Sequence, residues 1–174
     1  MIEIRHKATG DVLLRVDRDS LAEARLNHYD LAGGDLSGMN LRGISFEGSN
    51  LAGADLTKAD ARGADFRQAV LRGADLSGAD LHGARLGDRL PADGAVMTGC
   101  RLCDARMTAC DLSYADLRGA DLAGADLCRA DLQGALLTNA VMCGTTVGSA
   151  LLLEADLRGA DLTGAYLCNC RLNG

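Results

Sequence analysis

The chain has 174 residues, a formal net charge of −6 and only 3% aromatic residues, with no tryptophan. The negative charge disfavours simple binding to a phosphate backbone, and the lack of aromatic platforms disfavours base stacking, so we expect no direct contact with nucleic acid. The charged first residues, MIEIRHKATG, lack the apolar stretch of a signal peptide. The seven cysteines are odd in number and follow no framework spacing, which favours reduced thiols and a cytoplasmic location.

Residues 2–16, IEIRHKATGDVLLRV, predict two strands around a turn at 8–11. We expect residues 1–18 to form a β-hairpin that caps the structure that follows. The segment SLAE at 20–23 also fits a helix capping box. Leu21 and Leu26 keep the frame of the following repeat, so the repeat is favoured.

From residue 19 onward, a large apolar residue recurs every fifth position, with a small residue two places before it and often glycine two places after it. An α-helix turns about 100° per residue and would spread these side chains around its axis. A strand would send successive ones to opposite faces. A short extended piece followed by a turn keeps all of them inside if each pentapeptide is one side of a square. Coils of about 20 residues, stacked about 4.8 Å apart, then give about 7 to 8 coils.

We expect the apolar centres to fill the interior of this tube. The predicted core residues include Leu36, Leu41, Phe46, Leu56, Phe66, Leu76, Leu81, Leu102, Leu117, Leu122, Leu127, Leu132, Leu157 and Leu162.

The pattern A(D/N)LxG, as in ADLSGADLHGARL at 74–86, resembles the pentapeptide-repeat family over about residues 19–174. The resemblance implies an all-β fold, a right-handed quadrilateral β-helix; the period itself supports a square solenoid but not its hand. Most members of that family look like protein-interaction scaffolds. Some, of the quinolone-resistance type, resemble a DNA duplex and occupy DNA gyrase.

Between Leu86 and Met97 the frame shifts by one residue, and GDRLPADGAV holds the sole proline, Pro91. Proline cannot donate to a ladder. We expect a bulged corner at 87–96, with a partner-contacting loop as the alternative.

The sequence offers no catalytic, cofactor or metal site. The three histidines are dispersed, and CRLC at 100–103 would place Cys100 inward and Cys103 outward, which does not suit tetrahedral zinc. The frame likewise places Cys110 and Cys170 inward. Cys128, Cys143 and Cys168 are expected outside with Cys103, too far apart for disulfides.

Residues 20 apart should stack, with one extra residue across the break. This register predicts an acidic column of Asp35, Asp55 and Asp75 on one side. It also predicts a more acidic side, Asn40, Asp60, Asp80, Arg101, Asp121 and Asp161, and a slightly basic side, Arg25, Arg67, Arg85, Arg106 and Arg129. Solvated repeat residues without a function are the alternative.

The segment 136–153, LLTNAVMCGTTVGSALLL, carries no charge. Its predicted outward residues are Leu136, Val141, Leu151 and Leu153, and the coil before it has a ring of Asp116, Asp121, Asp126 and Asp131. An apolar belt beside acidic groups is a candidate protein-contact site, with a drifted, tolerant coil as the alternative. A transmembrane helix is disfavoured by the polar residues and the surviving period, so we expect no membrane association.

We therefore expect a non-enzymatic scaffold with an unknown protein partner and no cofactor. The alternative is a DNA-mimicking binder of DNA gyrase. A rod of about 36 Å matches DNA with about 20 negative charges, whereas this chain offers −6 with arginines interleaved. The segment YLCNCRLNG stops inside a repeat, which predicts a homodimer through a bare C-terminal end formed by Leu157, Leu162, Leu167 and Leu172, or a frayed last coil.

Overall fold

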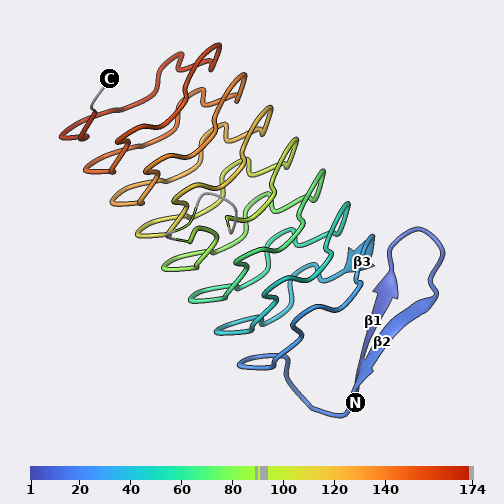
Figure 1. Ribbon diagram of the computed structural model, residues 1–174. Helices are drawn as coiled ribbons and strands as arrows, with labels where there is room; N and C mark the ends of the chain where they lie inside the picture. Colours follow the sequence, from blue (N-terminus) through green and yellow to red (C-terminus); the bar gives the residue numbers. More distant parts are fainter. Residues whose placement is uncertain (89, 91–93, 173–174) are drawn as a thin grey trace.

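The computed structural model describes residues 1–88, 90 and 94–172, and they form one stack of four-sided coils with a hairpin at the N-terminal end (Figure 1). The hairpin strands are β1 (Ile2–His6) and β2 (Val12–Val16), and a short β3 (Gly34–Asp35) joins them in the order β2-β1-β3. The described residues include no helix. The all-β solenoid predicted from the period of five is confirmed.

The corners of the tube are tight turns that begin at an inward residue, most often leucine. In the turn Leu51–Ala54, the Ala54 N–H donates to the Leu51 carbonyl over 3.0 Å, and Gly53 has φ of +64°. A positive φ at the third residue is the mark of a type II turn. Among the residues that the structure describes, twelve that are not glycine have the same positive φ, between 55° and 61°.

The coils are joined by a parallel hydrogen-bond ladder along every side. The Leu51 N–H donates to the Val70 carbonyl of the next coil over 2.7 Å, and the Asp55 N–H donates to the Gly34 carbonyl of the preceding coil over 2.9 Å. Partners at the same point of successive coils are 20 residues apart, as in the Asn50–Asp30 contact. Because this register repeats, the residue before each leucine stacks in one of four columns.

The aspartate before each leucine is tied to its own turn. The Asp55 Oδ1 accepts a hydrogen bond from the Thr57 N–H over 2.9 Å and another from the Thr57 hydroxyl over 2.7 Å. The backbone bond recurs at most of these aspartates, which satisfies an amide that points away from the ladder. The repeated acid is therefore a turn residue before it is a surface charge.

Large side chains line the axis of the tube. The predicted core residues from Leu36 to Leu132 are almost fully buried, and Phe46 and Phe66 stack with ring centroids 5.5 Å apart. Each buried leucine contributes about 1.5–3 kcal/mol before conformational entropy is subtracted. Leu157 and Leu162 are only half-buried, because no described coil covers them on their far side.

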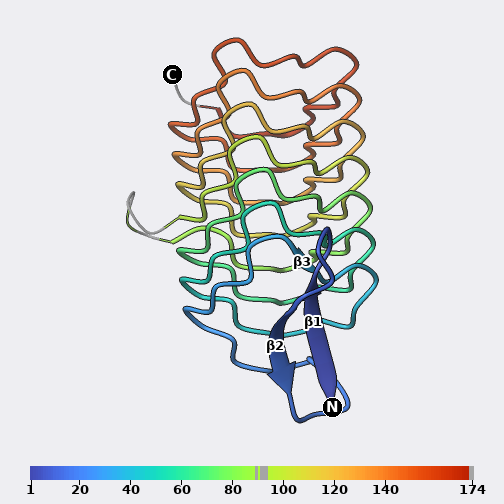
Figure 2. The same ribbon diagram turned by 90° about the vertical axis from the view of Figure 1, so that its right-hand side faces the viewer.

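The N-terminal hairpin lies against the first coils (Figure 2). Ile4 is fully buried in the core, and the Lys7 N–H donates to the Gly33 carbonyl over 2.8 Å, so the hairpin covers both apolar surface and part of the ladder edge. Leu21 is buried and Arg25 bridges to Ser45, so the SLAE segment belongs to the first coil.

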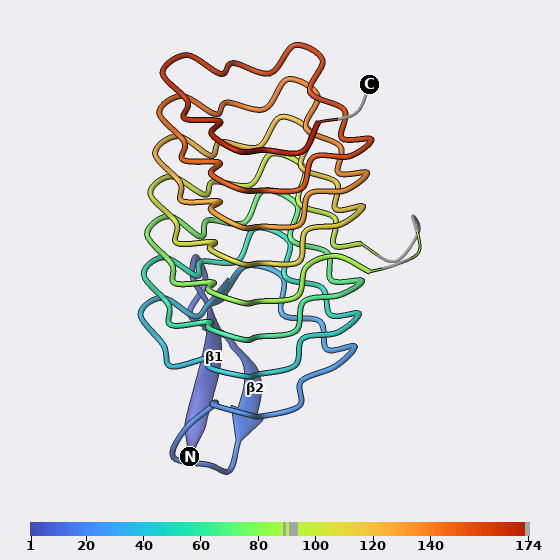
Figure 3. The ribbon, with the colours of Figure 1, turned by 90° about the vertical axis from the view of Figure 1, so that its left-hand side faces the viewer.

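The predicted stacking across 87–96, with one extra residue in the coil, is wrong. Across this segment the stacked partners are 26 residues apart, as in Arg106 and Asp80, in place of 20, so the interval holds six residues more than a regular coil. The coils before and after it stay stacked on one another (Figure 3). The Ala95 N–H donates to the Leu86 carbonyl over 2.7 Å, which closes the corner as if the loop were absent. Apart from Leu90, the segment has no large apolar residue to fill a corner, and Leu90 is 61% exposed. Pro91 lies outside the described residues.

Glycine is required where this loop leaves and rejoins the coil. A Cβ on Gly87 would lie 2.3 Å from the Ser113 nitrogen, and one on Gly94 would lie 2.4 Å from the Tyr114 carbonyl oxygen. Both clashes are with backbone, which cannot move aside cheaply. The base of the loop is thus packed directly on the next coil.

Exchanging alanine and glycine at a turn tests the left-handed corner. Ala109 has φ of 55°, so Ala109→Gly should raise the free energy of unfolding by about 0.5–1 kcal/mol. Gly53→Ala should lower it by a similar amount, about 0.5–1 kcal/mol, because the space around Gly53 is open and only backbone strain is added. Urea unfolding measures both; equal signs for the two variants would contradict the turn geometry.

Candidate functional site

The outer surface consists of four columns of residues, one on each side of the tube. They run Asp30–Asn50–Val70–Val96–Asp116–Leu136–Asp156, Asp35–Asp55–Asp75–Arg101–Asp121–Val141–Asp161, Asn40–Asp60–Asp80–Arg106–Asp126–Thr146–Tyr166 and Arg25–Ser45–Asp65–Arg85–Asp111–Asp131–Leu151–Arg171. We call these the Leu136, Val141, Thr146 and Leu151 sides. Asp35, Asp55 and Asp75 stack directly on one another, as do Asp60 and Asp80.

The predicted partners of the arginines after the break are wrong. Arg101 stacks between Asp75 and Asp121, not beside Asp80, and its Nη1 lies 3.5 Å from Asp75 Oδ2. Arg106 is not on the basic side with Arg25; it stacks on Asp80 with an N–O distance of 2.8 Å. The cause is the six-residue loop, which rotates every later residue by one side relative to the predicted register.

After the loop, both acidic columns are interrupted by arginine. Asp121 and Asp161 consequently belong to the Val141 side, above Arg101. The basic side keeps Arg25 and Arg85, and Arg67 lies beside them, 2.7 Å from Asp65. No side of the tube is uniformly acidic along its length.

The uncharged coil at 136–153 stacks directly on the acidic ring. Leu136, Val141, Thr146 and Leu151 each bridge to one of the four ring aspartates, Asp116, Asp121, Asp126 and Asp131. Leu136 is 37% exposed and Val141 is 39% exposed, whereas Leu151 and Leu153 are half-buried. The belt turns around three sides of the tube, with Leu136 and Val141 as its most exposed members.

The two residues that flank Leu136 in its column, Asp116 and Asp156, each form an ion pair. Arg118 Nη2 lies 2.6 Å from Asp116 Oδ2, and Arg158 Nη2 lies 2.6 Å from Asp156 Oδ2. In each pair the arginine hydrogen bond lowers the aspartate pKa, so both carboxylates stay ionised. An exposed leucine is thus enclosed by charged groups, an arrangement typical of protein contacts with an apolar centre and a polar rim.

Two of the seven thiols are buried in the core. Cys100 and Cys110 point into the core, where burial raises the pKa of each thiol to about 12. A thiol with such a pKa is a poor nucleophile and metal ligand at neutral pH. Cys170 is half-buried, Cys103, Cys128 and Cys143 are partly exposed, and Cys168 is exposed. Within the described residues no three metal-ligating side chains come together.

A search of the same described part of the chain for a helix long and apolar enough to cross a membrane finds none. The stretch 136–153 forms a coil of the solenoid.

Sequence reasoning missed the hydrogen bonds that fix the aspartates. The signal is present, because serine or threonine often stands two residues after the aspartate, as at Asp35 and Ser37, where the hydroxyl donates over 2.7 Å. This short motif identifies acids whose charge is already engaged. The ring aspartates Asp121, Asp126 and Asp131 each accept from the backbone amide two residues later, where the side chain is not serine or threonine.

Comparison with known proteins identifies the family. A family model for pentapeptide repeats matches the chain in 8 copies, at residues 49–88, 93–124, 120–150 and 135–174. The chain belongs to the pentapeptide-repeat family. Members of this family are generally structural or interaction proteins.

Solved structures of pentapeptide-repeat proteins are also similar to this one. HetL from Nostoc sp. strain PCC 7120, involved in heterocyst differentiation regulation, is 31% identical over 86% of this chain and 75% of HetL, with a TM-score of 0.42. Rfr23 from Cyanothece 51142 is 20% identical over 87% of this chain and 90% of Rfr23, with a TM-score of 0.47. Trypsin-treated QnrB1, a plasmid-mediated fluoroquinolone resistance protein, is 22% identical over 91% of this chain and 86% of QnrB1, with a TM-score of 0.42. A search of curated proteins finds no significant match.

The aspartates that accept hydrogen bonds or form ion pairs predict that the folded protein loses stability in acid. Hydrogen bonds and ion pairs lower the pKa of Asp35, Asp60, Asp65, Asp75, Asp116, Asp156 and Asp161. Because these pKa values lie below those of the unfolded chain, the unfolded state binds more protons in acid, and this stabilisation is lost as pH falls below about 4. The urea midpoint should therefore drop between pH 5 and pH 2. An unchanged midpoint would contradict the role given to the aspartates.

Proposed function

We propose that this pentapeptide-repeat protein is a non-enzymatic scaffold that presents the uncharged coil at 136–153 to a protein partner. The proposal rests on one observation above all, the exposure of Leu136 and Val141 between charged neighbours. A solvent-exposed leucine on a β-side has no role in the core, since the inward Leu137 fills that corner. The interior of the tube also supports a non-enzymatic role, because leucine, alanine and cysteine side chains fill it.

The geometry of the belt limits how a partner can approach. Leu136 and Val141 lie on adjacent sides, separated by the corner at Thr138 and Asn139, so a partner must fold over that corner to reach both. A flat partner surface would meet one side alone. We therefore expect a concave or clasping partner that buries Leu136 and pairs with Arg118 or Arg158 at the rim.

The alternative is a DNA-mimicking binder of DNA gyrase. A DNA mimic needs like charges in long uninterrupted rows. Here Arg101 stacks on Asp75 and Arg106 stacks on Asp80, which favours the scaffold over the mimic.

Replacing the exposed belt residues tests the scaffold. The double variant Leu136→Ser/Val141→Ser should lose capture of its partner from a lysate while its thermal unfolding stays within a few degrees of the wild type, because neither side chain is in the core. Adding Leu151→Ser and Leu153→Ser extends the test to the whole belt.

The matched control is Val70→Ser/Val96→Ser, on the Leu136 side but away from the belt. A protein held by the wild type and by this control, and lost by the belt variant, supports the belt. A protein held equally by all three contradicts it.

A supercoiling assay with DNA gyrase separates the two functions. The scaffold predicts no inhibition of supercoiling and no protection from a fluoroquinolone at micromolar protein. Inhibition or protection would support the mimic instead.

The homodimer through the C-terminal end stays a prediction. In the last described coil Leu167 is 36% exposed and Leu172 is 56% exposed. Sedimentation of Leu167→Lys against the wild type tests it: a dimer that becomes a monomer supports the pairing, and a wild-type monomer contradicts it.

A further inference from the structure

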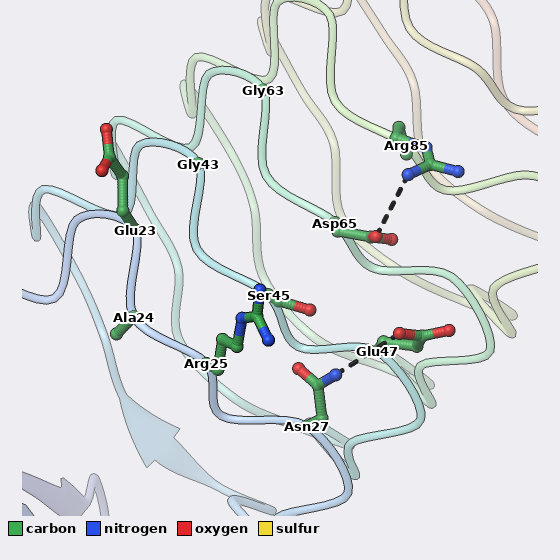
Figure 4. A pocket seen from close by; sticks show the side chains of 10 residues that line it. All are labelled: Glu23, Ala24, Arg25, Asn27, Gly43, Ser45, Glu47, Gly63, Asp65 and Arg85. Atoms are coloured by element: carbon green, nitrogen blue, oxygen red, sulfur yellow. Dashed lines mark hydrogen bonds and ion pairs between the residues drawn. The ribbon is translucent and has the colours of Figure 1, made fainter.

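A polar hollow of about 660 Å³ lies on the Leu151 side, over the first four coils (Figure 4). Ser45 lies in its middle, and Gly43 and Gly63 line one edge together with the side chain of Glu23. Arg25 lies at the N-terminal edge of the hollow and Arg85 at the opposite edge. The hollow is far from the belt along the axis of the tube.

In the column Arg25–Ser45–Asp65–Arg85, the residue at position 45 is uncharged. Asp65 accepts from Arg67 over 2.7 Å and lies 3.4 Å from Arg85, the arginine one coil later. Arg25 stacks on position 45 from the coil before it, and the residue there is serine in place of the acid found in most repeats. Among the described residues Arg25 therefore makes no ion pair or side-chain hydrogen bond, and the Ser45 hydroxyl makes none either.

A second group at the same edge is unsatisfied. The Asn27 Nδ2 donates to Glu47 Oε2 over 3.3 Å, which fixes the orientation of the amide. Its Oδ1 is buried and accepts no hydrogen bond from the described residues. Arg25 and Asn27, two residues apart in the chain, both line the hollow (Figure 4). A guanidinium has five N–H donors, so Arg25 can serve Asn27 and a bound group at once.

We propose that this hollow binds a carboxylate side chain, aspartate or glutamate, of a protein partner. The carboxylate takes the place of the acid missing at position 45 and accepts hydrogen bonds from the Arg25 guanidinium and the Ser45 hydroxyl. Such charge-assisted bonds are about twice as strong as neutral ones.

The neighbouring acids favour a carboxylate over a phosphate group. Glu23, Glu47 and Asp65 all line the hollow, so a doubly charged phosphate meets more repulsion than a singly charged carboxylate. Glu47 and Asp65 are both within 4 Å of Arg67, which offsets part of their charge toward a single carboxylate. The site does not depend on the belt, so either proposal can fail alone.

NMR titration of the full chain with a short capped peptide that carries one glutamate tests the site. The amides of residues 25, 27 and 45 should shift, and the glutamine version of the peptide should leave them unmoved. Inorganic phosphate is the second probe and should bind more weakly than the glutamate peptide.

Three variants make the test specific. Arg25→Gln removes the donor, and Ser45→Asp supplies an internal carboxylate, so both should weaken peptide binding by about tenfold or more. Arg85→Gln has the same charge change in the same hollow, but Arg85 is already paired with Asp65, so its affinity should stay within about twofold of the wild type. Equal loss in Arg85→Gln and Arg25→Gln would overturn the proposal, as would tighter binding of phosphate or of the glutamine peptide.

Discussion

In each five-residue repeat of the solenoid, the backbone must turn a corner and one residue must place a large side chain on the axis of the tube. The turn needs a positive φ two residues after the leucine, as at Gly53, where φ is +64°. For an L-amino acid this conformation costs about 1 kcal/mol or more, whereas glycine has no Cβ and adopts it readily. Burial of the leucine, about 1.5–3 kcal/mol per side chain, exceeds this strain, which explains why residues such as Lys58 and Ala109 are tolerated at turns.

The position of each corner also determines which residues point outward and form the surface. Because the residue before each leucine points outward and stacks with its counterparts in neighbouring coils, the exterior is a set of four columns with a fixed spacing. Most acids in these columns are held by their own turns, as Asp55 is by Thr57. The residues at which we propose partner contacts are exceptions to the repeat: Leu136 and Val141 replace an acid with an apolar side chain, and Ser45 replaces an acid beside Arg25.

The period of five was sufficient to predict the solenoid and the inward leucines, and the strand and turn pattern of residues 2–16 was sufficient to predict the hairpin, because each depends on local spacing. It could not predict the columns beyond the break. The interval from Leu86 to Met97 fits one extra residue or six, since the two differ by one whole repeat, and only the coordinates distinguish them. The unsatisfied Asn27 Oδ1 could not be predicted from the sequence either, because its hydrogen bonding depends on which side chain lies one coil away. Sequence reasoning located the belt through its lack of charge, but not the difference in exposure between Leu136 and Leu151.

Two adjacent leucines test the inward and outward assignment most directly. Leu136 is 37% exposed and Leu137 is fully buried, although they are neighbours in the chain and identical in type. In urea unfolding, Leu137→Ala should lower the free energy of unfolding by about 2–5 kcal/mol, whereas Leu136→Ala should change it by less than about 0.5 kcal/mol. Equal losses, or a larger loss at Leu136, would contradict a tube whose leucines are held at its corners.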